Sequence, residues 1–369
     1  MTGSPQRIGR YVVVRELGRG GMGEVYLAYS PAGDPVAVKL IRVDSLSEMT
    51  RKRFEKEALI ARTVVGTNRV ARFLDADPFA DRPWLAMEYV PGKVLQAHVK
   101  EDGPLQPVLV ASLGALLAEG ISAVHSTGLL HRDLKPQNII LGDYGPVVID
   151  FGLAAFIDRS IESLSRKGMI VGTPACMSPE QANGDPQVTA AADVYSLGTV
   201  LLFAATGHGA YTGGTWQAIV AQVANREQSP DLSGLPDVLR MLVTSMLAYE
   251  PTERPSVDEV TEACTKIMEQ LGVPPATARR ALISQTTSVT RSDMAVLTAS
   301  VEDVLAQQPG DDPVSPLNGP PPNEPGQTQV DETSTDSQPS PPVAPKGRIP
   351  ASGRIAEELR QAYSLHGSL

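Results

Sequence analysis

The sequence predicts an α+β protein with a small, β-rich N-terminal lobe and a larger helical lobe. Residues 11–86 alternate short β-branched and apolar runs with one helix-like stretch, a pattern typical of a mainly antiparallel sheet. From about residue 91 to 271, apolar side chains recur mostly at helical spacing. A chain of 369 residues is long enough for two lobes around one cleft plus an appendage.

The first motif is a glycine-rich segment. LGRGGMGEVY, residues 17–26, lies between two strand-like runs, YVVVREL and EVYLAYS, and this setting predicts a β-hairpin. Glycine lets the backbone approach phosphate oxygens and point N–H groups at them, although glycines in turns often serve the turn alone. A dinucleotide-binding fold would need a helix after the third glycine, so the strand that follows argues against one.

The next strand carries a lysine among apolar neighbours. Lys39 stands in the run VAVKL beside Val38 and Leu40, so we expect its strand to be largely buried. Such a lysine needs a partner, because an unpaired buried ammonium group is costly.

Two further motifs carry acidic side chains. HRDLKPQN occupies residues 131–138, and Asp150-Phe151-Gly152 follows a short apolar strand. Asp133 can take a proton from an attacking hydroxyl, and Asn138 and Asp150 can hold Mg²⁺ on nucleotide phosphates. These residue types together predict a phosphoryl-transfer site.

The order and spacing of these motifs resemble the signature of protein kinases. Further matches are SPE at 178–180, Asp193 in DVYSLG and Arg254 in PTERPS. The form GRGGMGEVY, with Lys-Pro after Asp133-Leu134, is similar to the bacterial eukaryotic-like (Hanks-type) protein serine/threonine kinases.

The resemblance covers residues 8–271 and implies the bilobal protein kinase fold. The N-lobe would span about 8–86, the hinge 87–92 and the C-lobe 93–271. The implied activity is transfer of the γ-phosphate of ATP, with Mg²⁺, to serine or threonine hydroxyls of protein substrates in signal transduction. Autophosphorylation is expected, with a homodimer as one arrangement for it.

The resemblance also assigns roles to individual residues. Asp133 would be the catalytic base, and Lys135 would lie near the transferred phosphate. Lys39 would bind the α- and β-phosphates and pair with a glutamate of the following helix. Glu57 and Glu55 are both candidates; we favour Glu57 because it borders the apolar face, whereas Glu55 should project into solvent.

Nucleotide and metal ligands follow from the same resemblance. In the hinge, Met87 would face the back of the nucleotide pocket, and Glu88 and Val90 would offer backbone hydrogen bonds to adenine. Asn138 and Asp150 would bind the metal. The full set expected to bind the nucleotide is Leu17, Gly18, Gly20, Gly23, Val25, Ala37, Lys39, Met87, Glu88 and Val90.

Between Asp150 and Glu180 the resemblance places an activation loop. Ser165 falls where related bacterial kinases carry an activating phosphate, and Arg132 would receive that phosphate through charge-assisted hydrogen bonds. Thr173 is expected to hydrogen-bond toward the catalytic loop.

Other matches concern support of the loop and of the substrate site. Asp193 is either a helix N-terminal carboxylate and nothing more or, by family precedent, the residue that holds the catalytic-loop backbone. Glu180 and Arg254 are expected to form a buried ion pair. Cys176 stands where a tyrosine is usual and Ala210-Tyr211 where Pro-Phe is frequent, so the peptide preference of relatives does not transfer directly.

Composition sets further limits. The formal net charge of −10 argues against a general nucleic-acid binder, and two cysteines do not form a disulfide framework. The N-terminus lacks a signal-peptide pattern. The longest apolar stretches are either interrupted by Glu119 or too short to span a bilayer. We expect no zinc site, no membrane span and a cytoplasmic location.

Beyond residue 271 the resemblance stops. Residues 272–308 are predicted to be a partly helical extension. Residues 309–345 hold eleven prolines and six acidic side chains in 37 positions, so we expect a disordered linker. Residues 346–369 are predicted to form a short amphipathic helix.

Two other functions are compatible with parts of the sequence. A nucleotide-binding pseudokinase or scaffold could act through the C-terminal tail, although the phosphate-handling set is intact. A small-molecule kinase of similar fold is the third alternative, and the SPE segment and the serine-bearing loop argue for protein substrates instead.

Overall fold

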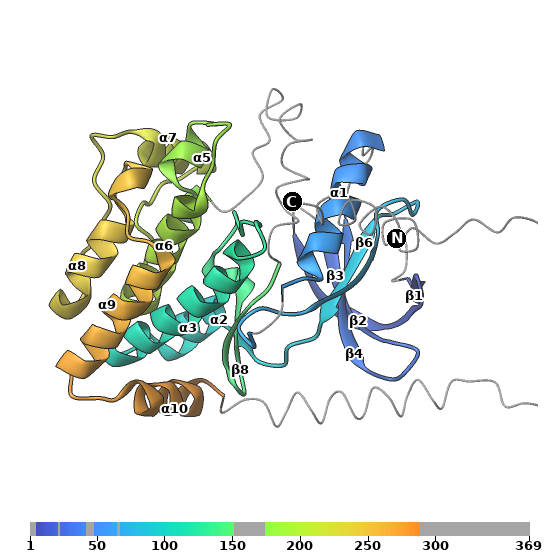
Figure 1. Cartoon of the computed structure of the whole chain (residues 1–369), viewed down its shortest axis with the longest axis horizontal. Coiled ribbons are helices and arrows are strands. Elements are labelled where there is room, and N and C mark those ends of the chain that lie inside the picture. The colour runs from blue at the N-terminus through green and yellow to red at the C-terminus, as the bar shows by residue number, and fades with distance from the viewer. Residues whose placement is uncertain (1–4, 21–22, 42–47, 65–66, 151–173, 288–369) are drawn as a thin grey trace, which may run out of the picture. The chain divides into compact units, whose positions relative to one another are not determined.

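The computed structural model describes residues 5–20, 23–41, 48–64, 67–150 and 174–287. All of them lie in the first of two compact units, residues 1–309. Within the helix at 48–61, the side chains of Met49, Thr50, Arg53 and Glu57 lie outside the description. A sheet-rich N-terminal part precedes a helical part (Figure 1), which confirms the predicted α+β class.

Six antiparallel strands form the N-terminal sheet, in the order β1-β2-β3-β4-β6-β5. Side chains alternate between the two faces of the sheet. One face packs Tyr26 and Val38 with Trp84, and the other packs Met87 with Phe54 of α1. The bounds are Arg7–Ile8 (β1), Tyr11–Gly20 (β2), Gly23–Tyr29 (β3), Pro35–Ile41 (β4), Glu48–Ala61 (α1), Phe73–Asp77 (β5) and Trp84–Glu88 (β6).

The C-terminal part is built around two long apolar helices, α3 and α6. Its helices are α2 (Leu95–Asp102), α3 (Pro107–His125), α5 (Pro179–Ala182), α6 (Ala190–Thr206), α7 (Trp216–Ala224), α8 (Asp237–Met246), α9 (Val257–Gln270) and α10 (Pro275–Thr286). The described residues of this part also form the 3₁₀ turns η1 (Pro136–Asn138), η2 (Pro174–Cys176) and η3 (Pro251–Glu253).

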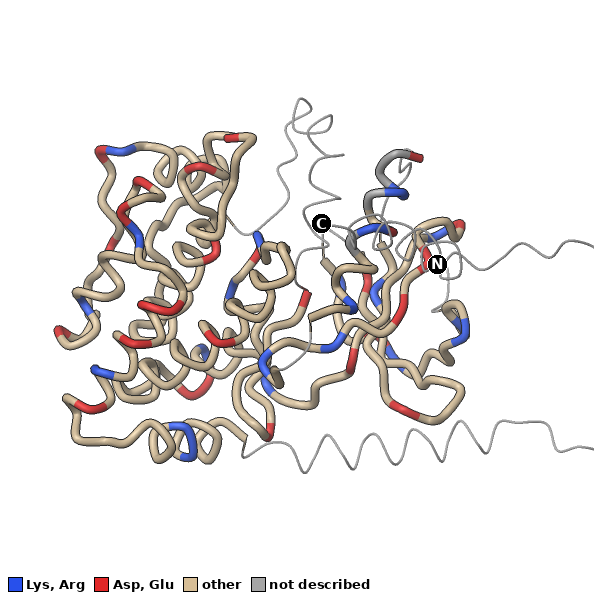
Figure 2. The backbone as a smooth tube through the Cα atoms, in the orientation of Figure 1, with Lys and Arg blue, Asp and Glu red and all other residues tan. Residues whose placement is uncertain are grey.

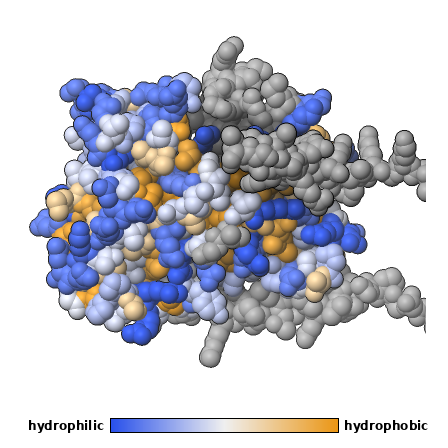
Figure 3. All heavy atoms as spheres, viewed as in Figure 1, coloured by the Kyte–Doolittle hydropathy of each residue, from blue (hydrophilic) through white to orange (hydrophobic). Residues whose placement is uncertain are grey.

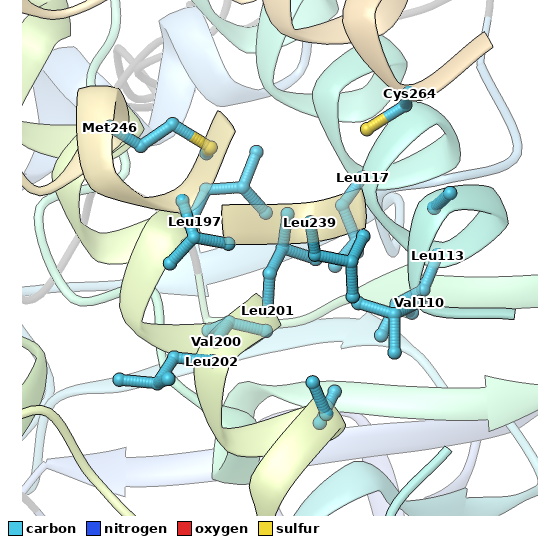
Figure 4. Packing of buried hydrophobic residues seen from close by; sticks show 14 of the residues in the cluster. Val110, Leu113, Leu117, Leu197, Val200, Leu201, Leu202, Leu239, Met246 and Cys264 are labelled. Atoms are coloured by element: carbon cyan, nitrogen blue, oxygen red, sulfur yellow. The ribbon is translucent and has the colours of Figure 1, made fainter. Parts of the chain in front are cut away.

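Close approach of the helices explains two glycines of this core. Figure 4 shows leucines of α3 and α6 packing with Leu239 and Met246 of α8 and with Cys264 of α9. A Cβ at Gly114 of α3 would lie 2.8 Å from the Cys264 Sγ, and one at Gly198 of α6 would lie 2.9 Å from the Met246 Cβ. Larger residues at either position would force the helices apart.

Among the described residues, α3 is the one helix long and apolar enough to cross a membrane. In the structure, 61% of this stretch is buried, and the helix packs against α6, α9 and α10. A core helix of a globular lobe has the same length and composition. On the face that Figure 3 shows, the described surface carries hydrophilic residues with hydrophobic residues among them.

A short hairpin brings the two predicted metal ligands together. Strands β8 (Ile139–Gly142) and β9 (Gly145–Val148) are joined by a two-residue turn, and β7 (Lys93–Val94) pairs with β8. Asn138 directly precedes β8, and Asp150 follows soon after β9. The N–H of Ile149 donates to the carbonyl oxygen of Asn138 at 2.9 Å, so both ends of the hairpin meet.

Helix α10 packs on the rest of the C-terminal part and reaches the turn of this hairpin. Leu282 is fully buried against the core formed with α3 and α9. Arg279 donates to the carbonyl oxygen of Tyr144 at 3.3 Å, and the buried Arg69 donates to the same oxygen at 2.7 Å. The helix lies within the predicted extension, 272–308, whose boundaries stay a prediction.

Replacing Leu282 with Ala should lower the free energy of unfolding by about 2–5 kcal/mol, because it leaves a cavity in a packed core. Urea unfolding followed by circular dichroism measures this change. The exposed Arg280→Ala on the same helix is the matched control and should change stability by about 0.5 kcal/mol or less. Equal stability of the two variants would mean that α10 does not pack as described.

Candidate active site

The glycine-rich segment forms the predicted hairpin between β2 and β3. Gly18 pairs with Val25, and Gly20 pairs with Gly23 across the two strands. A Cβ built on Gly18 or Gly20 meets no atom within 4 Å, so packing within the protein does not require glycine there. The open space above these glycines is suited to a group that approaches the backbone closely. The loop tip, Gly21-Met22, lies outside the described residues.

The sheet gathers several predicted nucleotide-binding residues on one face. Val25 lies opposite Lys39 and Ala37 lies opposite Met87, and Ala37 and Lys39 are two positions apart on β4. Because side chains alternate along a strand, these four share the face that also packs against α1. Leu17, in β2, is half-buried.

The hinge residues lie at the end of β6 and just after it. Met87 is buried among apolar side chains, and Glu88 and Val90 are half-buried. The N–H of Glu88 donates to the carbonyl oxygen of Arg72 at 2.8 Å. A nucleotide contact through Glu88 would therefore use its carbonyl oxygen.

Lys39 of β4 forms an ion pair with Asp150, which follows β9. The Lys39 Nζ lies 2.7 Å from the Asp150 Oδ2, and both side chains are largely enclosed. Asp150 adopts a left-handed backbone conformation with φ of 60°, which is uncommon outside glycine and concentrates at functional sites. Figure 2 shows that basic and acidic residues both occur along the backbone of the sheet and of the helical part.

The predicted Lys39–Glu57 pair stays a prediction, because the Glu57 side chain lies outside the description. Phe54, Ala58 and Ala61 are all buried, which confirms the apolar face of α1 on which the preference for Glu57 depended. Glu55, expected to project into solvent, is half-buried instead.

The segment 131–138, the catalytic loop expected from the resemblance, fixes the carboxylate of Asp133 with two donors. The Lys135 Nζ donates to the Asp133 Oδ2 at 2.6 Å, and the Asn138 Nδ2 donates to the same oxygen at 3.2 Å. The Asn138 Nδ2 also donates to the Asp133 carbonyl oxygen at 2.9 Å. Since the Asn138 amide nitrogen faces Asp133, its carbonyl oxygen points elsewhere and can serve as a ligand.

Asp193 holds the backbone of this loop from α6. Its fully buried carboxylate accepts the N–H groups of His131 and Arg132, each at 2.8 Å, and the His125 Nε2 at 2.7 Å. Arg132 adopts a left-handed conformation with φ of 62°, which these bonds stabilise. The structure thus agrees with the family precedent for Asp193 and shows more than a helix-terminal charge. The contribution of His125 had no signal in the sequence.

Burial and hydrogen bonding shift the pKa values of Asp193 and His131. Burial alone would raise the pKa of Asp193, but the hydrogen bond from His125 and the neighbouring histidines bring it below its usual value. Burial lowers the pKa of His131, whose Nδ1 accepts the Asp133 N–H and whose Nε2 lies 3.3 Å from the Ile149 carbonyl oxygen. This is the arrangement of a neutral imidazole with its proton on Nε2.

The predicted Glu180–Arg254 ion pair is confirmed. The two guanidinium nitrogens of Arg254 lie 2.7 and 2.8 Å from the carboxylate oxygens of Glu180, and both residues are buried. Arg254 also donates to the carbonyl oxygens of Ala248, Ala191 and Tyr249. Such full satisfaction is what a buried charged pair requires.

Two residues that depart from the expected family pattern, Cys176 and Tyr211, are both described. Cys176 lies in η2, and its carbonyl oxygen accepts a hydrogen bond from the Ser196 hydroxyl at 2.8 Å. Burial raises the pKa of its thiol to about 11, and that of Cys264 to about 12. Tyr211 is buried. Both cysteines are free.

Several predicted residues lie outside the described part of the chain. They are Phe151, the regulatory candidates Ser165 and Thr173, the predicted linker 309–345 and the predicted C-terminal helix 346–369. Arg132 is described, and its proposed phosphate contact stays a prediction.

A metal would find oxygen ligands at the meeting point of the hairpin ends. The described residues contain no group of three or more His, Cys, Asp or Glu side chains that could hold an ion. Mg²⁺ in nucleotide sites does not need such a group, because one or two protein ligands act together with phosphates and water. The carboxylate of Asp150 and the amide oxygen of Asn138 fit that donor set.

Comparison with known proteins identifies the fold. Residues 11–264 match the family model described as the protein kinase domain. The chain belongs to the protein kinase family. The predicted bilobal kinase fold is therefore confirmed.

The kinase domain is similar to two curated bacterial proteins. One is the probable serine/threonine-protein kinase PkwA of Thermomonospora curvata, 46% identical over 259 residues, or 70% of this chain and 34% of PkwA. The other is the serine/threonine-protein kinase AfsK of Streptomyces coelicolor, 45% identical over 253 residues, or 68% of this chain and 31% of AfsK. The chain spans about a third of the length of these relatives.

The kinase domain also resembles a solved structure. The crystal structure of a mutant PknI kinase domain from Mycobacterium tuberculosis superposes with a TM-score of 0.58 at 25% identity. The superposition covers 72% of this chain and 99% of that chain.

Replacing Asp193 with Asn should lower the free energy of unfolding by about 1–3 kcal/mol, because an amide NH₂ would then face a backbone N–H or the His125 ring. Urea unfolding monitors the loss. Asp143→Asn, in the exposed turn of the β8–β9 hairpin, makes the same chemical change and should leave stability within about 0.5 kcal/mol of the wild type. The role assigned to Asp193 fails if both variants unfold alike.

Both cysteines should resist alkylation in the native protein. With a pKa of about 11, only about one Cys176 thiol in a thousand is ionised at pH 8, and the thiolate is the reactive form. Mass spectrometry after iodoacetamide treatment should show slow labelling that rises steeply toward pH 11, and rapid labelling of both cysteines in urea. Fast labelling of native Cys176 at pH 7.5 would contradict the raised pKa of its thiol.

Proposed function

We propose that the chain is an ATP-dependent protein serine/threonine kinase. The observation that carries this proposal is the convergence of Asp133, held by Lys135 and Asn138, with the Lys39–Asp150 pair around the glycine-rich hairpin. The names of the relatives support the same activity. The residues expected to bind phosphate or metal are present in the sequence, and those with described side chains lie in this arrangement. No observation therefore favours the pseudokinase or scaffold alternative.

Asp133 is the proposed catalytic base. Its carboxylate would accept the proton of a serine or threonine hydroxyl as the oxygen attacks the γ-phosphate. The two donors on its Oδ2 fix the carboxylate so that the remaining oxygen can face the hydroxyl. The Lys135 ammonium, 2.6 Å away, would neutralise charge on the transferred phosphoryl group.

The nucleotide would lie between the hairpin and the hinge. Backbone N–H groups near Gly18, Gly20 and Gly23 would approach the phosphates, where no side chain intervenes. Lys39 would bind the α- and β-phosphates, and Glu57 is the proposed second partner of its ammonium. Val25, Ala37 and Met87 would border the adenine, with Leu17 beside them and with backbone contacts from Glu88 and Val90.

Mg²⁺ is the proposed metal, held by Asn138 and Asp150. When bound, it would neutralise phosphate charge and orient the γ-phosphate. In the structure, the Lys39 ammonium lies against the Asp150 carboxylate, and it would move toward the phosphates as the nucleotide enters. The hard oxygen ligands suit Mg²⁺ better than a thiolate-seeking metal.

Regulation and setting complete the proposal. Phosphorylation of Ser165 would place a dianion within reach of Arg132, and Thr173 would contact the catalytic loop. Autophosphorylation in a homodimer and a cytoplasmic location are proposed with it. Protein substrates with serine or threonine acceptors are favoured over small molecules.

Purified protein incubated with ATP and Mg²⁺ should gain phosphate, seen as added mass of about 80 Da per group by intact-mass spectrometry, a figure that follows from the atoms of the transferred phosphoryl group. Asp133→Asn should gain none, because its amide cannot accept the proton. Asp143→Asn is the matched control and should behave like the wild type. Phosphate on Asp133→Asn at the wild-type rate, or on none of the three proteins, would contradict the proposal.

A further inference from the structure

The side chain of Gln181 bridges two segments that the kinase reaction must align. Gln181 lies in α5, directly after the segment in which the activation loop ends. Its Nε2 donates to the carbonyl oxygen of Arg132 at 2.9 Å. Its Oε1 accepts the N–H of Ser178 at 3.2 Å and the Ser178 hydroxyl at 3.0 Å. The amide is thus used at both ends, which fixes its orientation.

The carbonyl that Gln181 binds belongs to a strained residue beside the proposed base. Arg132 has a φ of 62°, and its carbonyl group forms the peptide bond to Asp133. Asp193 accepts the N–H on the other side of Arg132 at 2.8 Å. Both polar groups of the Arg132 backbone therefore have partners from outside the loop: a carboxylate from α6 and an amide from α5.

We propose that Gln181 is a positioning residue for phosphoryl transfer, which orients the Arg132–Asp133 peptide and so aims the Asp133 carboxylate. The proposal rests on the proposed kinase function. In the Arg132–Asp133 peptide, the N–H of Asp133 donates to the His131 Nδ1 at 3.3 Å, and Gln181 supplies the donor to the carbonyl oxygen at 2.9 Å. Loss of the Gln181 donor would leave this peptide held at its N–H end alone. A small error in the direction of a catalytic base is costly, because proton transfer requires hydrogen-bond distance and alignment.

The Gln181 side chain also links the orientation of the Asp133 carboxylate to the segment that would contact the substrate peptide. Ser178 is fully buried and caps α5, and Glu180 in the same helix pairs with Arg254. Helix α5 is therefore held firmly on one side and reaches the catalytic loop on the other. A shift of the segment just before Ser178 would therefore change the orientation of Asp133 through the side-chain amide of Gln181.

Two variants remove the donor to Arg132. Gln181→Glu keeps the length and the acceptor for Ser178 but places a carboxylate oxygen against the Arg132 carbonyl oxygen. Gln181→Met keeps the approximate length without a charge, and loses the acceptor for Ser178 as well as the donor. Gln187→Glu makes the same charge change at an exposed position a few residues away, and is the matched control.

Three measurements on the full chain test the proposal. Autophosphorylation rate is followed by intact-mass spectrometry, ATP affinity by calorimetry with ATP and Mg²⁺, and hydrogen–deuterium exchange at residues 131–134 by mass spectrometry. We expect both Gln181 variants to lose about 10- to 100-fold in rate, with ATP affinity within about twofold of the wild type. Exchange at 131–134 should rise in both, and Gln187→Glu should match the wild type.

Unchanged exchange at residues 131–134 in both Gln181 variants overturns the proposal, whatever the activity. An autophosphorylation rate and an ATP affinity that fall together would also overturn it, because they would show a general loss of structure. If the wild type transfers no phosphate, the kinase function itself fails, and the exchange measurement still decides whether Gln181 orders the loop.

Discussion

The catalytic loop depends on the hydrogen bonds that the buried carboxylate of Asp193 accepts. A carboxylate removed from water must be fully hydrogen-bonded, and three donors supply this: two backbone N–H groups of the loop and the ring of His125. The buried Asp193 carboxylate needs the N–H groups of the loop as hydrogen-bond donors. The loop in turn needs this carboxylate to hold Arg132 at its unfavourable φ. Since Asp193 lies in α6, at the centre of the helical core, the position of Asp133 is set by the packing of the whole lobe.

The two lobes contribute to the site in different ways. The sheet supplies an open surface with glycines and one ammonium, while the helical lobe supplies carboxylates on short, tightly bonded segments. The Lys39–Asp150 pair joins them at 2.7 Å, between residues 111 positions apart in the chain. Among the described non-glycine residues, Arg132 and Asp150 adopt left-handed backbone conformations, and both lie next to the proposed chemistry.

Sequence reasoning reached the fold class, the glycine hairpin, the buried lysine strand and the Glu180–Arg254 pair, because each depends on local alternation or on a recognisable motif. It did not reach the Lys39–Asp150 contact or the His125–Asp193 contact, 68 positions apart, because these arise only when distant elements pack. Gln181 was missed although it stands three residues after Ser178, a spacing typical of a capping box.

The β8–β9 hairpin has a consequence for how this chain can diverge. Its two-residue turn, Asp143-Tyr144, is exposed, and Arg69 and Arg279 contact only the backbone of Tyr144, so side chains there are free to vary. Its length is not free. One inserted residue would move a strand by one position and turn its side chains to the opposite face. Asn138 and Asp150 would then no longer meet. Related sequences should therefore differ in the residues of this turn and agree in the number of residues that it contains.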